Sequence, residues 1–155
     1  MKIRLIEVNP DDRRHVQFLF ETRSHPQVVP MLFGAPPDSF EVHYAWLGRV
    51  QNVSRTLFLI ENGSSDLCGY CQLTPQEDGG IELGWVIHPN YQGLGYGKDS
   101  TRALVGEAQE RYPNHEIYLL VKRDNLKAIH VYRAVGFVEV GYDSATGSLK
   151  MSFVH

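Results

Sequence analysis

The chain contains the stretch Trp85-Val86-Ile87-His88-Pro89-Asn90-Tyr91-Gln92-Gly93-Leu94-Gly95-Tyr96-Gly97-Lys98. An apolar strand that stops at a proline, a glycine-rich loop and the start of a helix follow one another here. Glycines let an anion approach the backbone, and the unpaired N–H groups at a helix start point toward it. The stretch therefore predicts a site for a ligand that carries phosphate.

Two common nucleotide motifs do not fit this loop. The pattern GxxxxGK[ST] would need glycine at position 92 and serine or threonine at position 99, where the chain has Gln92 and Asp99. The pattern GxGxxG beginning at Gly93 would need a glycine in place of Lys98, and it should follow the first strand of a βαβ unit. The remaining alternative to a phosphate site is that the glycines only form a turn.

Working outward from the loop, the apolar residues alternate between strand and helix periodicity. Strand-like alternation predicts four strands before the loop, over residues 2–8, 55–61, 67–75 and 81–88. Helical spacing and capping residues predict two helices, over about residues 11–23 and 39–51. Four prolines within residues 24–39 restrict that segment to loops around a short helix at most.

The elements expected after the loop are a helix over 98–111, a strand over 116–121, a helix over about 124–135 and strands over 137–142 and 148–154. The resulting order, β-α-α-β-β-β-α-β-α-β-β, predicts one mixed α/β domain over residues 1–155. The last strand, Leu149 to Val154, is expected to be an exposed edge, which would permit a homodimer without requiring one.

Composition excludes several classes of protein. The 155 residues, 43% of them hydrophobic, can bury a core without disulfides or metal. No apolar run approaches the roughly 18 residues of a membrane span, and Met1 to Glu7 lacks the apolar centre of a secretory signal. A net charge of −3 gives no reason to expect nucleic acid. We therefore expect a cytoplasmic protein without a membrane or nucleic-acid partner.

Two cysteines have the CxxC spacing of a redox or zinc site. Cys68 and Cys71 lie in a predicted strand, where residues three apart point to opposite faces. The chain has no second CxxC to complete a zinc site, and no helix start follows the pair to lower a thiol pKa. We expect packing thiols and no bound metal.

Two patterns resemble the GNAT acetyltransferase superfamily. Gln92-x-x-Gly95-x-Gly97 is similar to its pyrophosphate-binding motif, and Asn125-x-x-Ala128-x-x-x-Tyr132-x-x-x-Gly136-Phe137 is similar to its second signature. The resemblance covers nearly the whole chain. It implies the GNAT fold, a central, mostly antiparallel twisted sheet of about six or seven strands flanked by about four helices. It also implies acetyl-CoA as the cofactor, with coenzyme A as a product.

The resemblance assigns the cofactor site residue by residue. It implies that the loop binds the pyrophosphate through the backbone of Gln92, Gly93, Leu94, Gly95, Tyr96, Gly97 and Lys98. The strand backbone at Val86 and Ile87 would pair with the pantetheine arm, and an N–H there would stabilise charge on the carbonyl oxygen. Asn125 would contact the pantetheine or phosphate region, although a helix cap explains this residue equally well.

Two side chains are implied in acid–base catalysis. Tyr132 would protonate the leaving thiolate, the alternative being a core tyrosine. Glu82 would take the proton from the amine, the alternative being a solvated strand glutamate. His88 or a water chain could replace Glu82 as the base.

The resemblance implies direct transfer of the acetyl group to a primary amine, either of a small molecule such as an amino sugar, nucleotide sugar or polyamine, or of a protein N-terminus. Arg23-Ser24-His25-Pro26 and Met31-Leu32-Phe33 resemble the corresponding stretch in members with such acceptors. Arg23 or His25 could contact an anionic acceptor or could be a surface residue. The competing function is a non-catalytic acyl-CoA-binding or regulatory module, and the chain could be a monomer or a homodimer.

Overall fold

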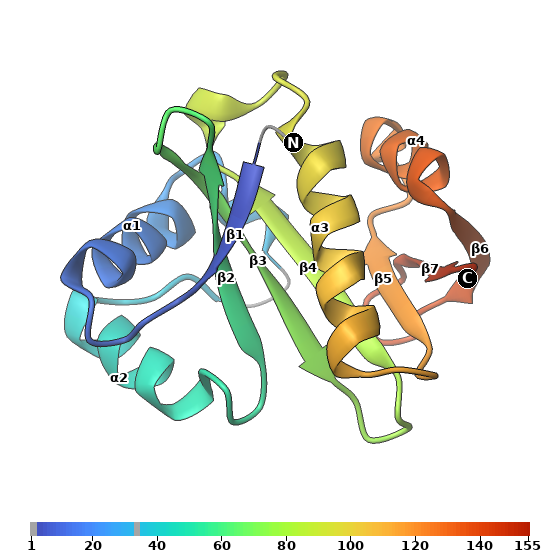
Figure 1. Ribbon diagram of the computed structural model, residues 1–155, viewed down its shortest axis with the longest axis horizontal. Helices are drawn as coiled ribbons and strands as arrows, with labels where there is room; N and C mark the ends of the chain where they lie inside the picture. The colour runs from blue at the N-terminus through green and yellow to red at the C-terminus, as the bar shows by residue number, and fades with distance from the viewer. Residues whose placement is uncertain (1–2, 33–34) are drawn as a thin grey trace.

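The computed structural model describes residues 3–32 and 35–155, and its central feature is a seven-stranded sheet flanked by helices (Figure 1). The strands are β1 Ile3–Glu7, β2 Thr56–Asn62, β3 Leu67–Pro75, β4 Ile81–Ile87, β5 Ile117–Val121, β6 Phe137–Tyr142 and β7 Leu149–Phe153. The helices are α1 Arg13–Ser24, α2 Phe40–Val50, α3 Tyr96–Arg111 and α4 Leu126–Val135, with short 3₁₀ turns at Val29–Met31 and Pro89–Tyr91.

The strands follow the spatial order β1-β2-β3-β4-β5-β7-β6. Neighbours are antiparallel except β4 and β5, which are parallel and are joined through α3. A parallel pair needs such a crossover connection, and here the glycine-rich loop lies at its start. The predicted fold class, a mostly antiparallel sheet with four helices, is confirmed.

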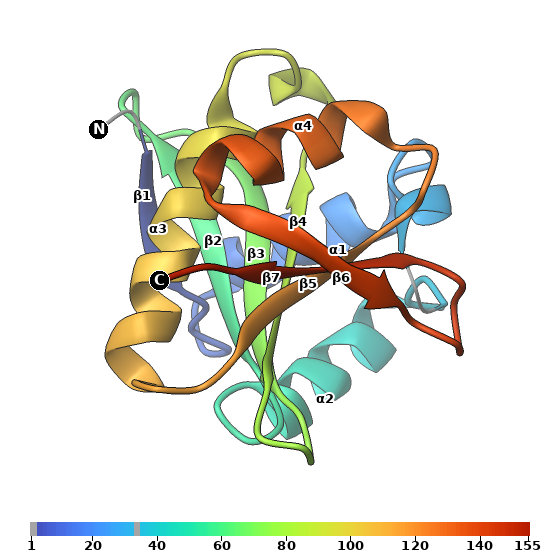
Figure 2. The same ribbon diagram turned by 90° about the vertical axis from the view of Figure 1, so that its right-hand side faces the viewer.

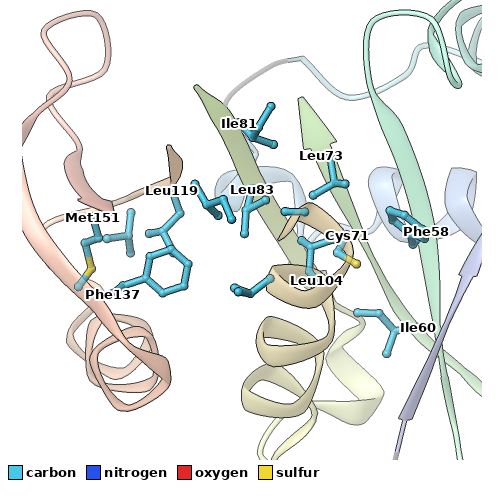
Figure 3. Close-up of a cluster of buried hydrophobic side chains, with 14 of the residues drawn as sticks. Phe58, Ile60, Cys71, Leu73, Ile81, Leu83, Leu104, Leu119, Phe137 and Met151 are labelled. Atoms are coloured by element: carbon cyan, nitrogen blue, oxygen red, sulfur yellow. The ribbon is translucent and has the colours of Figure 1, made fainter. Parts of the chain in front are cut away.

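A hydrophobic core lies on each face of the sheet. One core joins alternate residues of β2 to β5 and β7 with Leu104 and Val105 of α3 and Ile129 of α4, as Figure 3 shows in part. The other joins the opposite strand face with Leu19 of α1 and Leu47 of α2. Figure 1 shows these two helix pairs on opposite sides of the sheet. Because side chains alternate along a strand, each central strand contributes residues to both cores.

The predicted helix starts are confirmed by their caps. Asp12 accepts hydrogen bonds from two backbone N–H groups of α1, and the Ser39 hydroxyl accepts one from Val42 of α2. The third helix begins two residues earlier than predicted, at Tyr96, with Gly95 as its N-cap. Gly97 therefore belongs to the first turn of α3 and not to the loop before it.

The prediction of a C-terminal edge strand is wrong. β7 lies between β5 and β6, so β6 forms the edge of the sheet. Figure 2 shows α4 leading directly into β6, with β7 returning beside β5. Val138 and Val140 of β6 are exposed, whereas Leu149 and Met151 of β7 are buried. The order of elements in the sequence does not show which of the last two strands pairs with β5 and which forms the edge of the sheet.

Two expectations extend into residues outside the described part of the chain. The first strand was expected from residue 2, and the resemblance at Met31-Leu32-Phe33 reaches Phe33; residues 1–2 and 33–34 are not described. The prolines between the first two helices leave one short turn at Val29–Met31, as expected.

Both cysteines are buried free thiols. Burial raises the pKa of the Cys68 thiol to about 11 and also raises the pKa of Cys71. Residues 3–32 and 35–155 contain no cluster of metal-binding side chains. Across the same residues, every helix is too short or too polar to cross a membrane.

Candidate active site

β4 and β5 separate partway along the sheet. They pair only from Ile81 to Leu83 on β4 and from Ile117 to Leu119 on β5. On its other side, β4 stays paired with β3 as far as Ile87. The backbone of β4 from Gly84 to Ile87 therefore has one open edge, which is the surface that an extended ligand needs to pair as an added strand.

A cleft of about 520 Å³ opens at this separation. Its walls come from α1, α2, β3 and β4 on one side and from β5 and α4 on the other. Its ionisable and hydrogen-bonding side chains are Arg23, Trp46, Arg55, Tyr70, Gln72, Thr74, Gln76, Glu82, Trp85, Lys122, Asn125 and Tyr132. Residues widely separated in the sequence therefore meet where β4 is open.

The glycine-rich loop has the geometry of an anion site. Gly93 and Gly95 have φ values of 80° and 86°, in the left-handed region that glycine adopts easily. A Cβ placed on Gly93, Gly95 or Gly97 would meet no atom within 4 Å. Across the described residues, no acceptor is found for the backbone N–H groups of residues 93–98. These donors and the α3 dipole fit the pyrophosphate of coenzyme A.

Gln92 contributes a side-chain hydrogen bond, whereas its neighbours in the loop contribute backbone N–H groups. Its side-chain Nε2 donates a hydrogen bond to the Ile87 carbonyl oxygen at 3.0 Å, which ties the loop back to the end of β4. Asn125 caps α4 by accepting a hydrogen bond from the Ala128 N–H at 3.2 Å, and it also lines the cleft. Both explanations offered for Asn125 are thus compatible with its position.

Tyr132 lies where β4 is open. Its half-buried ring stacks on Trp85 with centroids 5.2 Å apart and meets Phe137 edge to face. Burial raises the pKa of Tyr132 to about 12, so its hydroxyl stays protonated at neutral pH. The indole N–H of Trp85 is buried and finds no acceptor in the described chain. The aromatic pair therefore holds a proton donor at the cleft.

Glu82 lines the other end of the cleft, half-buried on β4. Burial raises the pKa of its carboxyl and Asp143 raises it further, whereas the hydroxyl of Tyr118, as a hydrogen-bonding neighbour, and then the charge of Arg55 act in the opposite direction. Tyr118 is its register partner on β5. A carboxylate with a raised pKa is a stronger proton acceptor than a solvated one.

Arg23 is held in the cleft by uncharged groups. Its guanidinium lies 4.0 Å from the centre of the Trp46 ring, and its Nη1 is 3.4 Å from His43 Nδ1. Burial, and then the charge of Arg23, lower the pKa of His43 to about 4. His43 is therefore neutral at physiological pH and can accept the hydrogen bond from Arg23.

The pKa of His43 predicts a loss of stability in acid. Because the folded-state pKa is lowered from 6.5 to about 4, the unfolded chain binds more protons between these values, and stability falls as the pH falls through that window. Thermal unfolding from pH 7.5 to 4.5 should show a smaller loss for His43→Gln than for the wild type. Equal losses would show that His43 does not titrate on unfolding.

Two predicted residues lie outside the cleft. His25 and His88 meet edge to face with ring centroids 5.3 Å apart, and neither lines the cleft. His88 Nδ1 also accepts a hydrogen bond from the Asn90 N–H at 3.1 Å. The turn at Pro89 directs this side chain away from its neighbours on β4. Of the two predicted bases, Glu82 lines the cleft and His88 does not.

Sequence reasoning missed Trp46, Arg55 and Tyr70 in the cleft wall. Tyr70 is the register partner of Val86, so alternation along β3 and β4 would place it on the face of Glu82 once the pairing is known. Trp46 faces inward from α2 beside the buried Leu47. Arg55 precedes β2 and carries no local signal that would reveal its position.

Comparison with known proteins shows the family of the chain. The family model for the acetyltransferase (GNAT) domain matches residues 2–138. The spermidine N(1)-acetyltransferase of Vibrio cholerae is 25% identical, covering 84% of this chain and 78% of that protein. The spermine/spermidine N(1)-acetyltransferase of Bacillus subtilis strain 168 is 28% identical, covering 88% of each.

Solved structures show the same fold. The spermidine N-acetyltransferase of Vibrio cholerae in complex with CoA and spermine superposes with a TM-score of 0.83 at 21% identity, over 97% of this chain and 93% of that one. The open strand edge and the glycine loop fit the cofactor that such enzymes use. The chain belongs to the GNAT acetyltransferase family and is an acetyl-CoA-dependent N-acetyltransferase.

Proposed function

We propose that residues 1–155 form one catalytic domain that transfers the acetyl group of acetyl-CoA directly to a primary amine in the cleft between β4 and β5. The observation that carries this proposal is the separation of the two strands after Leu83, because it brings the open backbone of β4, Tyr132 and Glu82 into one cleft. The loop of residues 92–97 and Lys98 at the start of α3 would hold the pyrophosphate.

The side chains would divide the proton transfers between them. Bound acetyl-CoA supplies a thioester whose acetyl group can pass to an amine. Glu82 takes the proton that the acceptor amine must lose before it attacks. The backbone N–H of Ile87, which faces the open edge of β4, stabilises the negative charge that develops on the carbonyl oxygen, whereas the backbone of Val86 faces β3. Tyr132 donates its proton to the departing sulfur, so that coenzyme A leaves as the thiol.

The acceptor belongs to the class of small primary amines or peptide N-termini. The relatives named above act on spermidine and spermine according to their names, which supports polyamines as acceptors to test beside amino sugars and nucleotide sugars. A non-catalytic binding module would have no use for a protonated tyrosine and a half-buried carboxylate in the same cleft. Both groups therefore favour turnover over binding alone.

The proposal is tested by the release of coenzyme A thiol from acetyl-CoA over a panel of polyamines, amino sugars, nucleotide sugars and peptide N-termini. We expect acceptor-dependent release, with mass spectrometry showing one acetyl group added to an amine of the accepted compound. Saturable binding of acetyl-CoA without release for any amine would favour the non-catalytic module.

Replacing Glu82 with glutamine should lower kcat/KM at least about a hundredfold, because the amine then loses its base. In the wild type, activity should fall as the pH drops through the raised pKa of Glu82, since the carboxyl is protonated and inactive below it. The pH profile of Glu82→Gln should lack this acid limb. Glu77→Gln, at an exposed turn outside the cleft, is the matched control. An unchanged profile in Glu82→Gln would assign the base to another group.

A further inference from the structure

Two guanidinium groups share one wall of the cleft. Arg23, at the end of α1, lies 4.0 Å from the centre of the Trp46 ring, and Arg55, just before β2, lies 5.6 Å from it. Both arginines line the cleft together with Glu82. The indole thus holds two cations near one another beside the proposed base.

Neither arginine forms an ion pair in the described chain, although Arg55 lies close enough to Glu82 for its charge to lower the pKa of that carboxyl. The ion pairs of residues 3–32 and 35–155 all lie elsewhere, and Arg23 contacts the neutral side chains of His43 and Tyr70. The Nε of Arg55 is buried and, over the same residues, has no hydrogen-bond partner. An unpaired donor of a charged group in a cleft costs stability that a bound anion would recover.

The side chains that line the cleft carry a net positive charge, as the arginine pair does. Its lining side chains include Arg23, Arg55 and Lys122, against Glu82 as the one acidic residue in the described lining. Lys122 already donates a hydrogen bond to the Pro30 carbonyl oxygen at 2.8 Å. The two arginines also repel each other, and burial lowers the pKa of Arg23. Arginine forks match the oxygens of a phosphate or carboxylate, which would relieve this repulsion.

The phosphates of coenzyme A do not account for this pair. Arg55 leads into Thr56, which is paired through Leu73 to Leu83 near the start of β4. The glycine loop follows the other end of β4, after Ile87. Ile87 lies four positions beyond Leu83 on the strand, about 13 Å away at a strand rise of roughly 3.3 Å per residue. Arg55 therefore faces the proposed acceptor side of the cleft, and Arg23 lies near it over the same Trp46 ring.

We infer that the acceptor is a small amine that also carries a phosphate or carboxylate, which Arg23 and Arg55 bind while the amine faces Glu82. This inference rests on the proposed function and narrows its acceptor class. A polyamine brings several positive charges into a cleft that already holds more cations than anions, so its binding there is opposed by Coulomb repulsion. The anionic group gives the opposite interaction and fixes the orientation of the amine.

The test is a titration of inorganic phosphate, and separately of acetate, into protein saturated with coenzyme A at fixed ionic strength. Coenzyme A fills the loop, so the arginine pair remains as the anion site. We expect saturable binding, tighter for the anion class that the acceptor carries. Arg23→Gln and Arg55→Gln should each weaken it at least about tenfold through the loss of a charge-assisted hydrogen bond.

Matched variants separate anion binding from folding and from general charge. Arg23→Lys and Arg55→Lys keep the charge and the aliphatic stem but lose the fork, so they should bind the anion with intermediate affinity. Arg49→Gln removes an exposed arginine of α2 that lies outside the cleft and should bind as the wild type does. If Arg49→Gln weakened anion binding as much as Arg23→Gln and Arg55→Gln do, the loss would reflect only the net charge of the protein, and the inference would be overturned.

Kinetics give a second arm. Glucosamine and glucosamine 6-phosphate present the same amine with and without a phosphate, and spermidine presents an amine with further positive charges. We expect kcat/KM to be higher for glucosamine 6-phosphate than for spermidine. A higher value for spermidine, or no saturable binding of phosphate or acetate by the wild type, would overturn this inference. Failure of acetyl-CoA to bind would instead overturn the proposed function.

Discussion

Gly97→Asp is expected to weaken the binding of acetyl-CoA at least about a hundredfold, because it places a carboxylate beside the pyrophosphate and like charges in contact cost several kcal/mol. Gly97 lies in the first turn of α3, where an added Cβ meets open space. An acidic side chain in the first turn of a helix stabilises it by about 0.3–1 kcal/mol. The variant should therefore fold as well as the wild type while losing the cofactor.

Calorimetric titration with acetyl-CoA, beside thermal unfolding of the same samples, measures both effects. Gly97→Ala is the matched control, since it adds the Cβ without the charge and should keep most of the affinity. Gly95 is a poor position for this test, because its φ of 86° would strain any other residue. If Gly97→Asp bound acetyl-CoA as tightly as the wild type does, the pyrophosphate would not bind at the start of α3.

Tyr132→Phe is expected to lower kcat at least about tenfold while acetyl-CoA binding is kept. The hydroxyl has a pKa of about 12, so it is protonated at neutral pH and can donate its proton to the sulfur as the C–S bond breaks. Because a thiol has a pKa of roughly 8.5, this transfer is uphill by itself, and the proton that the acetylated nitrogen releases drives it by restoring the Tyr132 hydroxyl. The phenyl ring of the variant keeps the stack on Trp85 and the contact with Phe137. The loss should therefore appear in kcat and not in stability.

Steady-state kinetics with thiol detection, and calorimetry for the cofactor, would check this prediction. Tyr112→Phe removes a hydroxyl from a tyrosine that packs against the same core but lies outside the cleft, and it should behave as the wild type does. A kcat in Tyr132→Phe equal to that of the wild type would take this residue out of the mechanism and leave it as a packing tyrosine.

The elements that the sequence predicted well depend on local interactions. Asp12 and Ser39 mark the starts of α1 and α2 because each cap hydrogen-bonds residues two or three positions later. Alternating apolar residues placed the strands because each face of the sheet contacts a core. The glycine loop predicted an anion site for the same reason, since its donors and its helix are adjacent in sequence.

The features that the sequence did not predict depend on pairing between distant segments. The position of β7 inside the sheet follows from its pairing with β5, more than two dozen residues away in the chain. Tyr70 reaches the cleft through the register of β3 with β4, and Arg55 through the packing of α2 over the start of β2. His88 continues the alternation of β4, yet the Pro89 turn places it against His25.

The assignment of the candidate site therefore divides in two. The loop residues and Tyr132 came from motifs and Glu82 from its place on the strand before the loop, and the structure brings Tyr132 and Glu82 into the cleft at the separation of β4 and β5. The acceptor wall, with Arg55 and Trp46, became visible only with the fold. This division matches the chemistry, since cofactor binding uses backbone at a local motif and acceptor binding uses side chains from several elements.

A crystal structure with coenzyme A bound tests the central claim most directly, because the proposed contacts are largely made by the main chain and substitution tests them poorly. We predict the pyrophosphate on the N–H groups of residues 93–98, the pantetheine arm paired with the open edge of β4 at Trp85 and Ile87, whose backbone groups face away from β3, and the sulfur within hydrogen-bonding distance of the Tyr132 hydroxyl. Coenzyme A bound elsewhere, or with its sulfur away from the separation of β4 and β5, would contradict the account.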